Sequence, residues 1–158
     1  MKFNSIMHVA FFTDQIEVIR DFYENKLGCK PKMLMRNKVY IDSKHEEFKK
    51  LALDNPEGIF LIYFEIAPGQ FIEFFPKREG QGPHDEWNQN LGYAHFALLV
   101  DDIYKTRDEL ISAGIVIDTD ISKGPSGTYK FWIHDPDGNR FEIMQYTDES
   151  LQIKGSKN

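Results

Sequence analysis

The chain has 158 residues, and its 25 Asp and Glu outnumber its 19 Lys and Arg, giving a formal net charge of −6. This length suits one domain or two closely fused halves, and the acidic balance argues against a nucleic-acid partner, which needs a basic face. The lone cysteine, Cys29, excludes a disulfide framework and favours a cytoplasmic location, while no apolar run approaches the roughly 20 residues of a membrane span.

The first element is a strand and helix that the chain repeats. Residues 8–16 align without gaps on 95–103, and the match extends at the same offset through Arg20 and Arg107. Each copy has the pattern of a strand, an Asp N-cap, an amphipathic helix and a glycine that ends the helix. We therefore expect two related halves.

A second repeated element is a turn followed by a strand. Residues 68–75 resemble 137–144, and in both segments a turn glycine precedes a glutamate by four residues. Segments 59–67 and 129–134 are the predicted hairpin partners. Each half is thus predicted to be β-α-β-β-β, which makes the chain an α+β protein of two modules related by a pseudo-twofold axis.

These elements define the predicted organisation of a single domain. The first half is longer than the second between its histidine and its glutamate, and the extra segment reads as a short surface helix behind a Ser43 N-cap. The predicted bounds are 4–76 for module 1 with an inserted helix near 43–54, 77–91 for a linker, 92–147 for module 2, and 148–158 for a polar tail, all within one domain of 1–158.

Two histidines and two glutamates occupy equivalent places in the two halves, and they are the candidate functional residues. They are His8, Glu73, His95 and Glu142. Strand alternation and a pseudo-twofold would bring all of them to one point, where buried carboxylates need a compensating cation. A divalent metal held by two imidazoles and two carboxylates, with open positions for substrate, satisfies that need. The alternative for any one of them alone is an ordinary core or surface side chain.

Several other residues share the predicted strand faces of these candidates. Most are apolar and would form the wall of a site. Arg140 would either anchor an anionic substrate or lie in solvent as an ordinary strand arginine. The candidate substrate-binding residues are Phe12, Phe71, Phe75, Leu99, Arg140, Met144 and Tyr146.

Three motifs make the chain resemble the vicinal oxygen chelate superfamily, which includes glyoxalase I, bleomycin-resistance proteins and extradiol dioxygenases. They are His8 with the helix end at 22–28, the segment 92–97, and the segment 135–142. The resemblance implies paired modules that form an open eight-stranded mixed sheet cupping a metal ion, and frequent homodimers. Among members, the order His, Glu, His, Glu is that of bacterial-type glyoxalase I.

The resemblance implies a divalent-metal-dependent lyase or isomerase with one metal ion per chain, nickel, cobalt or zinc, with iron or manganese as further options. The ion would chelate vicinal oxygens of a small substrate, such as a methylglyoxal–thiol hemithioacetal, and stabilise an enediolate during proton transfer. Glu142 is the implied base, and Glu73 either ligates or returns the proton.

Two positions depart from the glyoxalase I pattern, and other functions remain open. Phe12 and Lys77 replace the arginine and asparagine expected there, which leaves open whether glutathione or another thiol is used. One alternative is a non-catalytic protein that sequesters a drug or metabolite in a cleft lined by phenylalanines. The others are a fosfomycin-resistance-type transferase and a ring-cleaving dioxygenase.

Overall fold

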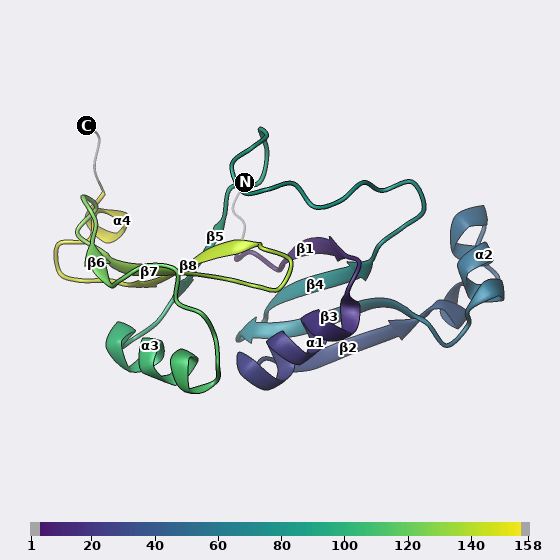
Figure 1. Ribbon diagram of the computed structural model, residues 1–158, viewed down its shortest axis with the longest axis horizontal. Coiled ribbons are helices and arrows are strands. Elements are labelled where there is room, and N and C mark those ends of the chain that lie inside the picture. The colour runs from purple at the N-terminus through teal and green to yellow at the C-terminus, as the bar shows by residue number, and fades with distance from the viewer. Residues whose placement is uncertain (1–3, 156–158) are drawn as a thin grey trace. The chain divides into compact units, whose positions relative to one another are not determined.

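The computed structural model describes residues 4–155, and the chain separates into two compact units, Met1–Gly82 and Pro83–Asn158. Each unit contains one four-stranded mixed sheet with helices, so the eight strands of the described residues fall into two sheets (Figure 1). The boundary between the units lies inside the segment 77–91 that the sequence predicts as a linker.

The first unit has the predicted β-α-β-β-β order with additional short helices. Its sheet has the order β1-β4-β3-β2, in which β1 runs parallel to β4 and the other neighbours are antiparallel. Its elements are β1 (His8–Thr13), α1 (Ile16–Asp21), η1 (Phe22–Lys26), β2 (Lys30–Arg36), η2 (Asn37–Tyr40), α2 (Glu46–Asp54), β3 (Ile59–Ala67) and β4 (Gln70–Pro76).

The second unit repeats this connectivity. Its sheet has the order β5-β8-β7-β6, again with the first strand parallel to the last. The second strand of this unit, β6, is much shorter than its counterpart β2. The elements are β5 (Phe96–Leu99), α3 (Ile103–Ser112), β6 (Ser122–Lys123), β7 (Tyr129–His134), β8 (Arg140–Gln145) and α4 (Leu151–Lys154). Helix α4 lies in the predicted polar tail, of which residues 156–158 are outside the described residues.

The predicted Asp N-cap is correct for the second repeat and wrong for the first. Asp102 precedes α3, and its carboxylate accepts hydrogen bonds from the backbone N–H groups of Tyr104 (3.1 Å) and Lys105 (3.0 Å). In the first repeat the cap position carries Gln15, whose side chain makes no capping bond. The helices start at aligned residues, but the aligned cap positions hold an aspartate in one copy and a glutamine in the other.

The inserted helix is confirmed, with a later start than predicted. Helix α2 begins at Glu46, and His45 rather than Ser43 holds the N-cap position. The Ser43 hydroxyl accepts a hydrogen bond from the His45 N–H (3.1 Å), so Ser43 shapes the turn before the helix. Phe48 packs against Phe60 with ring centroids 5.1 Å apart, which attaches the insertion to the start of β3.

Each sheet has one buried face and one open face, because side chains alternate along a strand. Tyr23 from η1 covers the buried face of the first sheet, with ring centroids 5.0 Å from Phe74 and 5.6 Å from Phe64. Glu73 lies on the open face of the first sheet, and Glu142 lies on the open face of the second. The buried-face strand residues are Ile62, Phe64, Ile72 and Phe74 in the first unit and Phe131, Ile133, Phe141 and Ile143 in the second.

Among residues 4–155, no helix has the length and apolar character that crossing a membrane requires.

We expect Phe74→Ala to lower the free energy of unfolding by about 3–5 kcal/mol, because Phe74 is 0% exposed and its removal leaves a cavity. Phe12→Ala removes the same ring from the open face, where Phe12 is 43% exposed, and should cost far less. Urea denaturation followed by circular dichroism measures both variants. Equal losses in the two variants would contradict this division into a buried and an open face.

Cys29 should be unreactive in the folded protein. Its side chain is buried after the turn at Gly28, and burial raises the pKa of the thiol to about 12. At about pH 8 the reactive thiolate is therefore almost absent. A chromogenic disulfide reagent should label the cysteine slowly in native protein and fast in denaturant; rapid native labelling would show that the thiol is accessible.

Candidate functional site

The first predicted pair, His8 and Glu73, lies together on the open face of the first sheet. The parallel register places His8 beside Phe71 and Ala10 beside Glu73, so the histidine and the glutamate are diagonal neighbours. His8 Nε2 is 3.3 Å from Glu73 Oε2. Glu73 is only 5% exposed, whereas the side chain of His8 is 38% exposed. A buried carboxylate and an accessible imidazole thus share one spot.

Tyr63, on β3, completes this group. It lies directly opposite Glu73 in the antiparallel register, and its ring contacts the His8 ring edge-on at a centroid distance of 5.5 Å. The pKa of the Tyr63 phenol is raised to about 12, chiefly by burial and further by the hydrogen bond to Glu73 and the charge of that carboxylate. Tyr63 therefore remains a proton donor that holds Glu73 in place.

The second predicted pair repeats this geometry in the second unit. His95 immediately precedes β5, and the register pairs Ala97 with Glu142. His95 Nε2 is 3.5 Å from Glu142 Oε2. Trp132 on β7 lies opposite Glu142, as Tyr63 lies opposite Glu73, and it contacts the His95 ring edge-on at 4.8 Å. The duplication therefore covers the histidine, the glutamate and an aromatic neighbour.

The two groups differ in the partner of the glutamate. Lys130, two residues before Trp132 on β7, places its Nζ 3.0 Å from Glu142 Oε1. The position two residues before Tyr63 holds Leu61, which is buried. Glu142 is thus held by an ammonium and Glu73 by a neutral phenol. Lys130 and Tyr63 were not predicted as site residues. Alternation places both on the open face, Tyr63 directly opposite Glu73 and Lys130 two residues before Trp132, which lies opposite Glu142.

The predicted apolar wall residues of the first unit gather on the same open face. Phe12 is aligned with Phe75, and their ring centroids are 5.4 Å apart. Phe71 contacts Tyr63 at 5.9 Å. This face is therefore aromatic around Glu73.

In the second unit the predicted wall residues are sparser. Leu99 is aligned with Met144 and is exposed, and Tyr146 is an exposed residue just beyond β8. None of them forms a ring cluster like that around Glu73. Their contact with a substrate stays a prediction.

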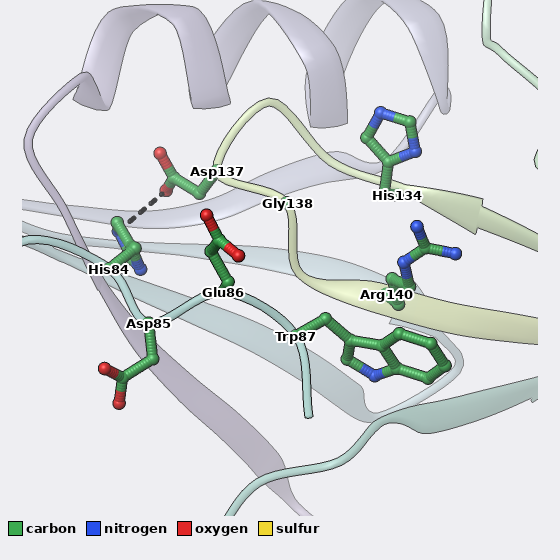
Figure 2. A pocket seen from close by; sticks show the side chains of 8 residues that line it. All are labelled: His84, Asp85, Glu86, Trp87, His134, Asp137, Gly138 and Arg140. Carbon is green, nitrogen blue, oxygen red and sulfur yellow. Dashed lines mark ion pairs between the residues drawn. The ribbon is translucent and has the colours of Figure 1, made fainter. Parts of the chain in front are cut away.

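Arg140 borders a separate pocket of the second unit (Figure 2). Its guanidinium lies over the Trp87 ring at 4.6 Å, and its Nη1 is 3.6 Å from Asp118 Oδ2. Asp118 also contacts His134 Nδ1 at 2.7 Å. The charge of Arg140 is engaged there rather than by Glu142. The pocket has a volume of about 330 Å³ and is lined by His84, Asp85, Glu86, Trp87, His134, Asp137, Gly138 and Arg140.

The structure therefore brings the four predicted ligands together as two pairs, each described within its own unit. Among the described residues, neither unit by itself assembles three or more His, Cys, Asp or Glu side chains placed to hold a metal ion. Each unit supplies one imidazole and one carboxylate, which we call a half-site: His8 and Glu73 in the first, His95 and Glu142 in the second.

Two β-α-β-β-β units with matching histidine and glutamate positions define the class of duplicated-module proteins that the motifs suggested. A family model agrees: that of the Glyoxalase/Bleomycin resistance protein/Dioxygenase superfamily matches residues 5–143. The chain belongs to this superfamily.

The individual relatives share a quarter or less of their residues with this chain. The chain is 25% identical over 156 residues to a "Probable lactoylglutathione lyase" of Vibrio cholerae, a match that covers 98% of this chain and 100% of the relative. Among solved structures it resembles a glyoxalase family protein from Enterococcus faecalis (TM-score 0.68, 21% identity, 91% of this chain and 99% of that one). It also resembles lactoylglutathione lyase from Agrobacterium tumefaciens (TM-score 0.58, 19% identity, 89% and 92%). These likenesses establish the fold.

Glu73→Gln should lower the pKa of the Tyr63 phenol from about 12 without restoring the ordinary value near 10. The substitution removes the negative charge beside the phenol, but the burial that contributes most to the shift remains. Titration of protein labelled with ¹³C at the tyrosine Cζ measures this directly. An unchanged pKa would show that Glu73 does not contact the hydroxyl in solution.

Proposed function

We propose that this chain is a divalent-metal-dependent lyase or isomerase of the glyoxalase I type. The observation that carries the proposal is the duplicated half-site. In both units a buried carboxylate oxygen lies within 3.5 Å of an accessible imidazole nitrogen on the open face of the sheet. Superfamily membership and the relative named as a probable lactoylglutathione lyase support it.

The residues of the half-sites fit a metal ion. Glu73 and Glu142 are 5% and 7% exposed, and buried carboxylates are costly without a cation or hydrogen bonds. Imidazole nitrogen and carboxylate oxygen together suit nickel, cobalt or zinc. One half-site offers only two donors, so we propose that two half-sites hold one ion. Either one chain or a homodimer supplies both half-sites.

The proposed chemistry is proton transfer at a carbon next to an oxygenated carbon. A divalent ion, when bound, supplies Lewis-acid activation of the substrate's vicinal oxygens. Glu142 takes the proton from the carbon. It then gives a proton back to the neighbouring carbon, directly or through Glu73, so that both carboxylates end unprotonated as they began, while Tyr63 keeps Glu73 oriented. The aromatic face around Phe71 and Phe75 packs against the apolar part of the substrate and excludes water.

The substrate that we propose to test first is the hemithioacetal of methylglyoxal and glutathione, because the Vibrio cholerae relative is named for that reaction class. Phe12 and the exposed Lys77 stand where glyoxalase I has glutathione-binding residues. Other thiols therefore belong in the same assay.

We also propose that the protein is a cytoplasmic homodimer. Sedimentation equilibrium of the purified protein tests whether it is a dimer.

Purified protein should take up about one divalent ion per pair of half-sites, and His95→Ala should lose most of it, because that variant removes one of four donors. Mass-spectrometric metal analysis after dialysis against nickel, cobalt or zinc gives the stoichiometry. His45→Ala, which removes a histidine outside the half-sites, is the control. Wild-type protein that takes up none of these ions would overturn the site.

Glu142→Gln should reduce kcat by about 10³-fold, the usual contribution of a general base, while preserving the fold. The matched control is Glu149→Gln, because Glu149 also pairs with a lysine, Lys123, away from the half-sites. Steady-state assays of both variants in the metal-loaded form make the comparison. Full activity of Glu142→Gln would remove the role assigned to this residue.

A further inference from the structure

The contact between Lys130 and Glu142 sets one half-site apart from the other. Lys130 Nζ lies 3.0 Å from Glu142 Oε1, while the other oxygen, Oε2, faces His95 Nε2 at 3.5 Å. The side chain of Lys130 is 33% exposed, so its ammonium is partly withdrawn from water and directed at a carboxylate that is almost fully buried. Such a charge-assisted contact is stronger than an ordinary surface ion pair.

The Trp132 ring helps to fix the position of this ammonium. Lys130 Nζ lies 5.6 Å from the centroid of the Trp132 ring, which itself contacts His95. Arg140 is the next cation along the sheet, but its guanidinium is engaged by Asp118 and Trp87. Lys130 is therefore the cation that the structure places at Glu142.

We propose that Lys130 is a built-in counter-cation of the site: it balances Glu142 before a metal ion binds and provides binding for an anionic group of the substrate afterwards. This inference rests on the proposed function, in which Glu142 is a metal ligand. It adds a substrate class, namely small oxygenated molecules that carry a negative charge.

A charge count explains both roles. The two glutamates and Lys130 leave the empty pair of half-sites with one net negative charge, if the imidazoles are neutral. A divalent ion converts this into one net positive charge, so the loaded site attracts an anion. Without Lys130 the loaded site would be neutral. The lysine thus weakens metal binding, since it repels the ion and competes for Glu142, and it strengthens anion binding.

The first experiment measures metal affinity. Lys130→Met removes the charge and keeps much of the apolar stem, and we expect it to bind Co²⁺ about fivefold more tightly than wild type by calorimetry. Lys130→Arg keeps the charge and should bind Co²⁺ as wild type does. Lys123→Met is the matched control, because Lys123 pairs with Glu149 in the same unit and away from the ligands. Circular dichroism verifies that each variant is folded.

The second experiment measures anion affinity. Inorganic sulfate is titrated into the cobalt-loaded proteins at constant ionic strength, and the visible absorption of Co²⁺ reports binding. Wild type, Lys130→Arg and Lys123→Met should bind sulfate about fivefold or more tightly than Lys130→Met.

The outcomes separate this inference from the proposed function. Wild-type protein that binds no Co²⁺ overturns the proposed function and this inference with it. If wild type binds Co²⁺ and Lys130→Met binds it equally or more weakly, the counter-cation role is wrong while the metal site stands. If sulfate binds equally to all loaded proteins, the anion-binding role is wrong.

Discussion

The parallel pairing of the first and last strands of each unit is the constraint on which the site depends. A parallel pair cannot be closed by a tight turn, so the chain must leave the first strand, form a helix and two further strands, and return. That path brings His8 next to Glu73 and His95 next to Glu142, although each pair is far apart in sequence. Any change of this register by one residue would turn the glutamate to the buried face.

The same strands carry both the core and the half-sites, and alternation keeps the two apart. Ile72 and Phe74 pack under the helix, while Glu73 between them points to the open face and is still nearly buried by its neighbours. A carboxylate in such a place needs partners. Tyr63 and His8 contact the carboxylate of Glu73, and Lys130 and His95 contact that of Glu142.

Much of this fold follows from sequence patterns, while the partners of the half-site residues do not. Strands β3 and β7 have the predicted bounds 59–67 and 129–134, because a turn glycine and alternating apolar residues mark both hairpins. The repeat likewise identified which histidines and glutamates correspond. The sequence did not predict the role of Tyr63, Trp132 and Lys130. Their role depends on the register between neighbouring strands, which alternation within one strand does not reveal. The cap at Gln15 was missed because the repeat has diverged there.

Within residues 4–155, each unit completes its own hydrogen-bonded four-stranded sheet. A difference such as that between Leu61 and Lys130 therefore alters the chemistry of one half-site without changing the strand pairing of the other. Gene duplication followed by independent drift of the two copies can in this way produce two unlike half-sites from two identical copies, with selection acting on each copy separately.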